Sequence, residues 1–187
     1  MKQKRALLVG AGNWGQNWGR TLQACTPVKI AGWVDVRPGA ARESARLLTL
    51  DGVYTGSDLG RAIADTEPDF VVNVTLPEAH AEVAIEAMEA GLPVLCEKPM
   101  ADTMPSARAM VEASERTGQL LMISQQRRYD ARLAEMRRLI EENIGPLGIL
   151  NSDFYRAHPT GLLHDPMPSP LILDMAIHTF DAARFVS

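Results

Sequence analysis

Short apolar runs and amphipathic segments alternate along the first 125 residues of the chain. The apolar runs are rich in β-branched residues and predict strands, at residues 5–10, 28–36, 68–75, 93–99 and 119–124. Segments with apolar residues every three or four positions predict helices between them, at residues 13–24, 39–48, 57–64, 77–91 and 103–118. Strands that alternate with helices indicate right-handed crossovers and an α/β fold with a doubly wound parallel sheet.

Two of the predicted helices carry recognisable end signals. The helix at 77–91 begins with Pro77, which suits a first turn, and ends at Gly91, a residue favoured just beyond a last turn. The helix at 57–64 opens with Ser57, a candidate N-cap. We expect the helix at 77–91 to bury one apolar stripe, made of Val83, Ala84, Ala87 and Met88.

The pattern changes after residue 125. One longer amphipathic helix is predicted at 128–145, and looser alternation at 147–157 predicts a strand. Residues 158–170 contain four prolines and predict an irregular loop, and a last helix is predicted at 170–187. The apolar stripe of the longer helix is expected at Leu133, Met136, Leu139 and Ile140.

Composition and charge narrow the class of protein. The 187 residues are 46% apolar and 22% charged, which is typical of a globular protein with a real core. A net charge of −4 argues against a nucleic-acid or anionic-membrane partner, and no apolar run approaches the ~20 residues of a membrane span. The first apolar run is shorter than the ~7–15 residues of a signal-peptide core, so we expect a cytoplasmic protein. The two cysteines, Cys25 and Cys96, show no metal-type spacing, and no metal site is expected.

The stretch "VGAGNWG" follows the first predicted strand and opens the first helix. It places Gly10, Gly12 and Gly15 in G-x-G-x-x-G spacing, the dinucleotide-binding pattern in its usual context. The first glycine permits a tight turn, the second lets the backbone approach a pyrophosphate, and the third lets helix and strand pack closely. The backbone N–H groups near Asn13 and Trp14 would then face the phosphates at the positive end of the helix dipole.

An acidic residue ends the second predicted strand. Asp35 lies 20 residues after Gly15 and is placed to accept hydrogen bonds from the adenosine ribose. Its carboxylate favours NAD, whereas Arg37 could tolerate the 2′-phosphate of NADP, so both cofactors stay open. Together these features predict an NAD(P)-binding Rossmann domain over residues 1–125.

Two further segments follow predicted strands at the same edge of the sheet. In "TLPEAH", Thr75, Pro77 and His80 could line the cofactor cleft, although Thr75 could instead be an N-cap and His80 a surface histidine. In "CEKP", Lys98 could polarise a carbonyl beside a nicotinamide, with Glu97 as its neighbour. The ordinary alternative for this Glu-Lys pair is an exposed ion pair of little energetic value.

The last predicted helix carries Asp174, His178 and Asp181 at i, i+4 and i+7, which would place them on one helical face. Histidine titrates near neutral pH and could take a hydroxyl proton, with the first aspartate orienting its ring. A surface Asp–His pair is the alternative. Asp181 could instead bridge to Arg184 or Arg37, or lie exposed.

These motifs, in this order and spacing, resemble the Gfo/Idh/MocA oxidoreductases, relatives of glucose–fructose oxidoreductase and inositol 2-dehydrogenase. The resemblance extends from residue 5 to residue 186. It implies that Lys98 is the catalytic lysine, His178 the general acid–base and Asp174 its acidic partner. It implies cofactor contacts around the nicotinamide for Glu97 and the segment 75–80. The segment "QRRY" resembles a less uniform stretch near the active site, which suggests substrate contacts for Gln126 and Arg128.

The same resemblance implies hydride transfer between NAD or NADP and a sugar, a polyol or a related carbonyl substrate. Family members are usually longer, with a large open sheet in their second domain, so residues 126–187 would be only the beginning of an α+β C-terminal domain. Apolar groups that this sheet covers would then be exposed or buried in a homo-oligomer. Three readings stay open: an intact enzyme, a nucleotide-binding module or inactive sensor subunit, and NAD-dependent glycoside cleavage.

Overall fold

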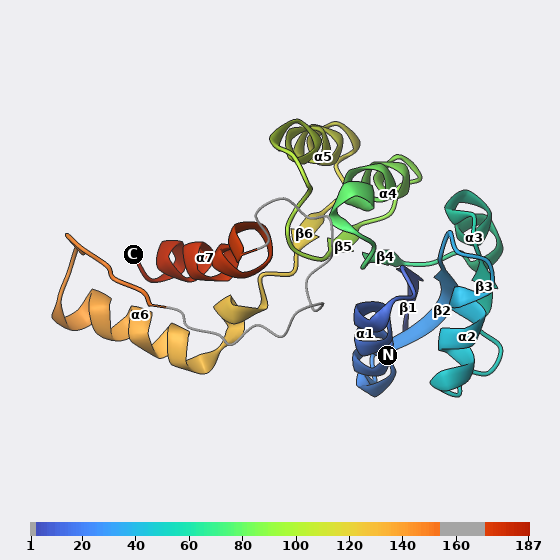
Figure 1. Cartoon of the computed structure of the whole chain (residues 1–187), viewed down its shortest axis with the longest axis horizontal. Coiled ribbons are helices and arrows are strands. Elements are labelled where there is room, and N and C mark those ends of the chain that lie inside the picture. Colours follow the sequence, from blue (N-terminus) through green and yellow to red (C-terminus); the bar gives the residue numbers. More distant parts are fainter. Residues whose placement is uncertain (1–2, 154–170) are drawn as a thin grey trace. The chain divides into compact units, whose positions relative to one another are not determined.

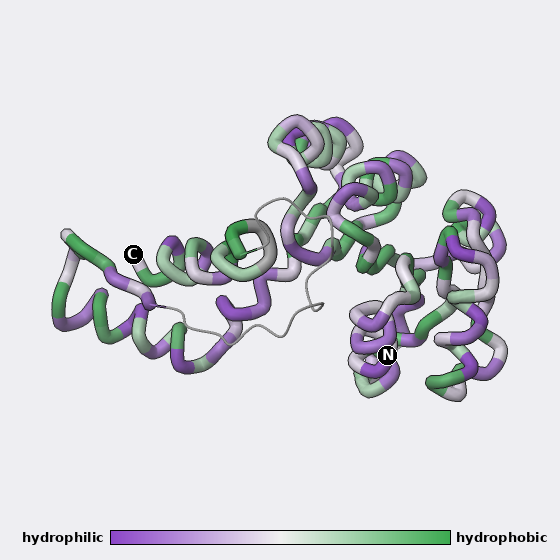
Figure 2. Tube along the Cα trace, viewed as in Figure 1, coloured by the Kyte–Doolittle hydropathy of each residue, from purple (hydrophilic) through white to green (hydrophobic). Residues whose placement is uncertain are grey.

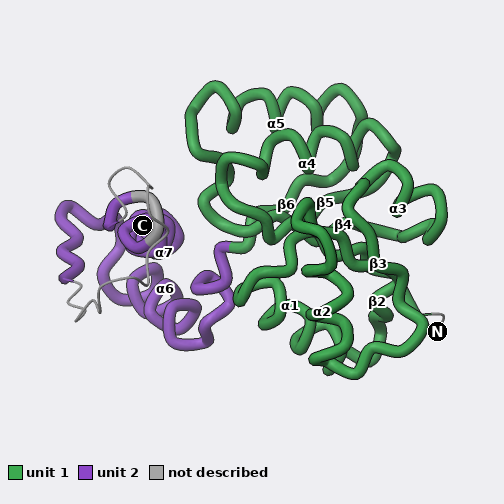
Figure 3. The backbone as a smooth tube through the Cα atoms, turned by 45° about the vertical axis from the view of Figure 1, so that its right-hand side comes forward, with its two compact units in different colours: residues 1–124 green, residues 125–187 purple. Residues whose placement is uncertain are grey.

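The computed structural model describes residues 3–153 and 171–187, apart from the side chains of Leu173 and Asp174. It consists of two compact units, one that ends at Ser124 and one that begins at Gln125 (Figure 3). Each unit is described below by itself.

The first unit is built on one six-stranded sheet in which every strand pair is parallel. The spatial order is β3-β2-β1-β4-β5-β6 (Figure 1). Strand order therefore reverses between β1 and β4, and the carboxyl ends of these two strands form the topological switch point where α/β sheets bind ligands. The strands are β1 Lys4–Val9, β2 Val28–Val34, β3 Tyr54–Gly56, β4 Phe70–Asn73, β5 Val94–Cys96 and β6 Leu121–Ile123.

Five helices connect these strands, and the predicted doubly wound α/β fold is confirmed. They are α1 Asn13–Ala24, α2 Ala40–Leu47, α3 Leu59–Thr66, α4 Pro77–Glu89 and α5 Met104–Thr117. The sequence reading missed β3, because three residues are too few to show a period. The three residues of β3 form a strand because they pair with β2.

Both faces of the sheet are buried, as the apolar strands predicted. Along β1, Leu7 and Val9 join one core cluster, which includes residues of α3, α4 and α5. Ala6 and Leu8 join a second cluster, which includes residues of α1 and α2. Figure 2 shows hydrophobic residues gathered along the neighbouring strands β4 and β5. This alternation lets helices cover the sheet on both sides and leaves its carboxyl edge as the place for polar side chains.

The helix ends show one correct prediction and one error. Helix α4 begins at Pro77, and Gly91 beyond its end has a left-handed φ of 83°, as predicted. Helix α3 is capped by Asp58, which accepts a 2.7 Å hydrogen bond from the Arg61 N–H, so the assignment of Ser57 as N-cap is wrong. The Asp58 carboxylate is also favourably placed at the positive end of the helix dipole.

The buried stripe of α4 is confirmed for Ala84, Ala87 and Met88, while Val83 is partly buried. This stripe also includes His80, which is almost fully buried. A buried polar residue on an apolar face requires hydrogen-bond partners, and these are described with the site below.

The second unit begins with a single 3₁₀ turn, Gln126–Tyr129, followed by helix α6, Ala131–Asn143. The prediction of one helix over 128–145 is wrong at its start because Asp130 is an N-cap and accepts a 2.9 Å hydrogen bond from the Arg132 N–H. Of the predicted stripe, Ile140 is buried and Leu133 partly buried, whereas Met136 and Leu139 are exposed.

Residues 147–153 form no strand, contrary to the prediction for 147–157. The rest of that segment and the predicted loop at 158–170 lie outside the described residues. The last helix begins as a π-helical turn, Leu171–Ala176, and continues as α7, Ile177–Val186. The Arg137 guanidinium of α6 lies 5.2 Å from the centre of the Phe185 ring of α7, a cation–π contact between these two helices.

Candidate functional site

The glycine-rich turn joins β1 to α1 and has the geometry that a bound pyrophosphate requires. Gly10 has a φ of 105°, and a Cβ there would lie 2.5 Å from the Val74 carbonyl oxygen. A Cβ on Gly15 would lie 2.2 Å from the Gly10 carbonyl oxygen, so both glycines are needed for packing. A Cβ on Gly12 would meet no atom within 4 Å, so this position faces open space at the N-terminus of α1.

The first helical residues, Asn13 and Trp14, lie beside this open space, and the Trp14 ring is half exposed. Gly12 caps α1 without any side-chain hydrogen bond to the first N–H groups. Uncapped N–H groups at the positive end of a 12-residue helix are a ready anion site. The turn therefore fits the diphosphate of a dinucleotide.

A buried tryptophan that the sequence analysis did not single out forms a hydrogen bond to this turn. The indole Nε1 of Trp33 donates a 2.9 Å hydrogen bond to the Gly10 carbonyl oxygen, and the ring is fully buried. A Cβ on Gly19 would lie 2.8 Å from this ring, so the glycine makes room for it. A tryptophan in a buried strand needs an acceptor for its N–H, and that need was the available signal.

Asp35 lies just beyond the end of β2 and is buried, with its carboxylate facing the glycine-rich turn. Its Oδ2 atom accepts a 2.7 Å hydrogen bond from the Ala11 N–H, and its Oδ1 atom accepts one of 2.9 Å from the Arg37 N–H. The Arg37 guanidinium also donates to both oxygens. Burial raises the pKa of this carboxyl, but the hydrogen bonds outweigh it, and the pKa of Asp35 is below its usual value. The acid is therefore a fixed anion beside the turn.

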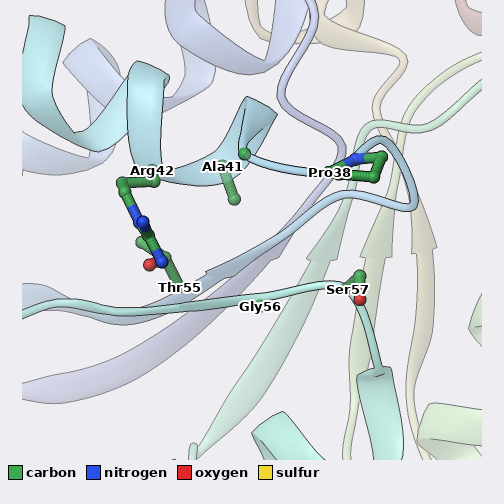
Figure 4. A pocket seen from close by; sticks show the side chains of 7 residues that line it. Pro38, Ala41, Arg42, Thr55, Gly56 and Ser57 are labelled. Carbon is green, nitrogen blue, oxygen red and sulfur yellow. The ribbon is translucent and has the colours of Figure 1, made fainter.

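A small pocket lies beside the loop that follows β2 (Figure 4). Its volume is about 120 Å³, less than the ~300 Å³ or more of ordinary ligand pockets. The pocket is bounded by the start of α2 and the end of β3, and it is lined by Pro38, Gly39, Ala41, Arg42, Thr55, Gly56 and Ser57. It is too small to hold a whole dinucleotide.

The segment after β4 is held by a network of buried hydrogen bonds. The Thr75 hydroxyl donates to Asn73 Oδ1 at 2.7 Å, and Asn73 Nδ2 donates to the His80 carbonyl oxygen at 3.0 Å. Leu76, not Thr75, is the N-cap residue of α4, so the N-cap alternative for Thr75 is wrong. Sequence reasoning missed Asn73, whose buried amide at a strand end was the only signal.

His80 joins the segment after β4 to the segment after β5. Its Nδ1 atom lies 2.8 Å from the Pro99 carbonyl oxygen, and its Nε2 atom lies 3.1 Å from the Thr75 carbonyl oxygen. The surface-histidine alternative is wrong, because the residue is almost fully buried. Burial lowers the pKa of this imidazole, and the carbonyl contacts only partly oppose that effect. The ring is thus a link between two strand ends.

Glu97 and Lys98 come directly after β5. The Glu97 carboxylate is buried and accepts hydrogen bonds from the Trp18 indole at 2.8 Å and from the Lys98 N–H at 2.9 Å. The alternative of an exposed ion pair is therefore wrong for Glu97. Lys98 is partly buried, and the peptide bond between Lys98 and Pro99 is cis. Burial strongly raises the pKa of the Cys96 thiol, so this cysteine is a buried hydrophobe, as expected.

In the second unit, His178 is buried on α7. Asp181, three residues later, accepts hydrogen bonds from Arg128 Nε at 2.7 Å and from Arg128 Nη2 at 2.5 Å. Two alternatives for Asp181, a bridge to Arg184 and an exposed side chain, are therefore wrong, because it pairs with Arg128 and is 11% exposed. The side chain of Asp174 lies outside the described part of the chain, and its backbone belongs to the π-helical turn.

The two weaker candidates lie in the 3₁₀ turn that opens this unit. Gln126 is exposed, and Arg128 joins the turn to α7. Among the residues that the structure describes, no group of His, Cys, Asp and Glu could hold a metal ion. None of the helices within residues 3–153 and 171–187 has the length and apolarity of a membrane span.

Comparison with known proteins agrees with this geometry. Residues 4–125 match the model of the oxidoreductase family with an NAD-binding Rossmann fold, Gfo/Idh/MocA. Inositol 2-dehydrogenase 2 of Saccharopolyspora erythraea is 34% identical over 96% of this chain and 52% of the relative. The rhizopine catabolism protein MocA of Rhizobium meliloti is 30% identical over 100% of this chain and 58% of the relative. The chain thus spans about half the length of these curated relatives.

Two solved structures show the same fold. An NAD-binding protein from Listeria innocua superposes with a TM-score of 0.83 and 26% identity, over 100% of this chain and 55% of that one. The WlbA dehydrogenase of Bordetella pertussis, solved with NADH and UDP-GlcNAcA, gives a TM-score of 0.68 and 28% identity, over 75% of this chain and 42% of that one. With the family model matching most of its length, the chain belongs to the Gfo/Idh/MocA oxidoreductase family and carries its NAD-binding Rossmann domain.

Proposed function

We propose that this chain binds NAD or NADP and transfers a hydride to or from the carbon of a CH–OH group in a sugar or polyol. One observation carries the proposal: the parallel sheet brings four motifs to its carboxyl edge. These motifs are the glycine-rich turn after β1, Asp35 after β2, the segment 75–80 after β4 and the pair Glu97–Lys98 after β5. This is the edge at which doubly wound sheets bind dinucleotides.

The nicotinamide of the bound cofactor would supply the hydride acceptor or donor. The N–H groups at the start of α1 would hold its diphosphate, and Asp35 would accept hydrogen bonds from its adenosine ribose. Each oxygen of Glu97 accepts one hydrogen bond from a protein donor, which leaves an acceptor position on each for a contact with the nicotinamide half of the cofactor. Its bond to the Lys98 N–H would also hold the backbone of Lys98 in place.

Lys98 would donate a hydrogen bond to the reacting oxygen and so stabilise the charge that develops there. His178 would take or return the hydroxyl proton, with Asp174 orienting its ring. Gln126 and Arg128 would contact the substrate. Arg128 would first have to give up its hydrogen bonds to Asp181.

The names of the relatives support the substrate class. The relative from Saccharopolyspora erythraea is an inositol 2-dehydrogenase, and the WlbA dehydrogenase of Bordetella pertussis was solved with UDP-GlcNAcA. We therefore propose a polyhydroxylated small molecule as substrate. A cytoplasmic location and association between copies of the chain belong to the same proposal, and exposed Met136 and Leu139 on α6 support the association.

The test is a turnover assay with NAD and NADP against myo-inositol and a panel of polyols and sugars, read by the absorbance of the reduced nicotinamide. We expect Lys98→Met and His178→Asn each to lower kcat by about 10²–10⁴-fold. The site assignment fails if activity persists undiminished in both variants.

A second candidate function is cofactor binding without turnover. The observation in its favour is that the family match covers residues 4–125, the NAD-binding Rossmann fold, and does not reach His178. Calorimetry with NAD would then show saturable binding, while every substrate in the panel would leave the nicotinamide unreduced. Binding combined with turnover on any polyol would exclude it.

A further inference from the structure

The carboxylate of Asp35 has no acceptor position left for a ribose in this structure. A carboxylate offers about four lone-pair positions, and four N–H donors occupy them here. Oδ1 accepts from the Arg37 backbone N–H and from Arg37 Nε, each at 2.9 Å. Oδ2 accepts from the Ala11 N–H at 2.7 Å and from Arg37 Nη2 at 2.8 Å.

The four donors are of two kinds. The Ala11 and Arg37 backbone N–H groups are fixed by the glycine-rich turn and by the loop after β2. The Arg37 side chain is 62% exposed, whereas the Asp35 side chain is 7% exposed. An exposed guanidinium can swing into water at small cost, but the backbone donors cannot leave without unfolding the turn.

The guanidinium fork therefore occupies the two positions that a vicinal diol would use. Both present two N–H or O–H donors to the two oxygens of one carboxylate. A ribose with free 2′- and 3′-hydroxyls can bind Asp35 only if the guanidinium leaves. A ribose with a 2′-phosphate brings an anion with which the released guanidinium can form a bidentate pair.

We propose that Arg37 is a specificity-determining residue, which competes with the ribose of NAD for Asp35 and pairs with the 2′-phosphate of NADP once released. This inference rests on the proposed binding of a dinucleotide at the glycine-rich turn. Arg37 thus weakens NAD binding and strengthens NADP binding, which narrows the preference that Asp35 alone would impose.

The test compares the dissociation constants of NAD and NADP, measured by calorimetry, in the wild type, Arg37→Ala, Arg37→Lys and Arg46→Ala. Arg46 is the matched control, because it lies on α2, is exposed and forms an ordinary ion pair with Glu43. For Arg37→Ala we expect NAD to bind about three- to tenfold more tightly and NADP about tenfold more weakly. Arg37→Lys keeps the charge but loses the fork, so it should tighten NAD binding less and retain part of the NADP affinity. Arg46→Ala should leave the ratio of the two constants within about twofold of the wild type.

Each other outcome has a defined meaning. NAD binding that is unchanged or weaker in Arg37→Ala overturns the proposal, because Arg37 would then not compete for Asp35. If Arg37→Ala fails to fold by circular dichroism, the same criterion applies to Arg37→Lys. If the wild type binds neither NAD nor NADP, the proposed function fails and the proposal falls with it. If both cofactors bind but the variants keep the wild-type preference between them, the proposed role of Arg37 is contradicted and the proposed function is not.

Discussion

The indole of Trp18 in α1 donates a 2.8 Å hydrogen bond to the buried carboxylate of Glu97 after β5. The two residues are 79 positions apart, and the contact ties the helix that would bind phosphate to the strand end that presents Lys98. The other oxygen of Glu97 accepts from the Lys98 N–H. A buried carboxylate needs both donors, because an uncompensated charge in a protein interior is costly.

Trp18→Phe removes the indole donor and keeps an aromatic ring in place. We expect the free energy of unfolding, measured by urea denaturation, to fall by about 1.5–3 kcal/mol, the usual worth of a hydrogen bond to a charged group. Trp14→Phe on the same helix is the control, and its half-exposed ring should cost less than about 0.5 kcal/mol. Equal losses in the two variants would mean that the hydrogen bond to Glu97 carries no special weight.

Alanine at Gly12 should mainly lower NAD affinity, whereas alanine at Gly15 should mainly lower stability. In Gly12→Ala the new methyl group meets no protein atom, so stability should change by less than about 0.5 kcal/mol, while NAD affinity should fall about tenfold or more. In Gly15→Ala the methyl group would approach the Gly10 carbonyl oxygen to 2.2 Å, which should cost about 2–3 kcal/mol of stability. Thermal unfolding and calorimetry with NAD separate the two effects. Wild-type NAD affinity in Gly12→Ala would show that the diphosphate does not approach this turn.

His80 predicts a pH dependence of stability. Burial lowers the pKa of this imidazole in the folded state below its ordinary value of 6.5, so the unfolded state binds more protons as the pH falls through that value. The stability that neutral His80 provides is therefore present above about pH 6.5 and is lost as the pH falls below that value, through the lowered pKa of the folded state.

His80→Gln removes this titration. At about pH 7.5 it should cost about 1–3 kcal/mol, because buried carbonyl oxygens lose the ring contacts. Between about pH 7.5 and 5, its unfolding free energy should fall less than that of the wild type. The other histidines are present in both proteins, so the difference isolates His80. Parallel pH profiles would contradict a depressed pKa at this position.

The bond between Arg128 and Asp181 should hold α7, and with it His178, to the 3₁₀ turn. The side chain of Asp181 is 11% exposed, and both of its oxygens accept from Arg128. Asp181→Asn loses the charge-assisted pair with Arg128. We expect faster hydrogen exchange across α7 and a free energy of unfolding that is lower by about 1–2 kcal/mol. Glu142→Gln in the exposed pair with Arg138 is the control and should leave this exchange unchanged. Equal protection of α7 in both variants would show that the pair does not anchor it.

Local patterns were enough to predict most of the first unit. The five crossover helices, the long strands and the glycine-rich turn depend on short-range rules: a hydrophobic period, Pro77 at a first turn, Gly91 beyond a last one. Asp35 was predictable as well, because its distance from the glycines is set by one strand, one helix and one turn. Errors occurred where one side chain fixed the end of an element. Asp130, for example, caps α6 and so divides the predicted helix into a 3₁₀ turn and a shorter helix.

The sequence by itself determined the fold class and which residues reach the carboxyl edge of the sheet, because both follow from periodicity along the chain. Only the tertiary structure decided what those residues do there. It placed Trp18 on Glu97 and the His80 ring between two carbonyl oxygens, and it joined Arg128 to Asp181. Such pairings join positions that are far apart in the sequence or hidden in an apolar stripe, and no local pattern encodes the partner. A buried polar group must find a partner wherever packing brings one within reach, so the fold rather than the motif assigns it.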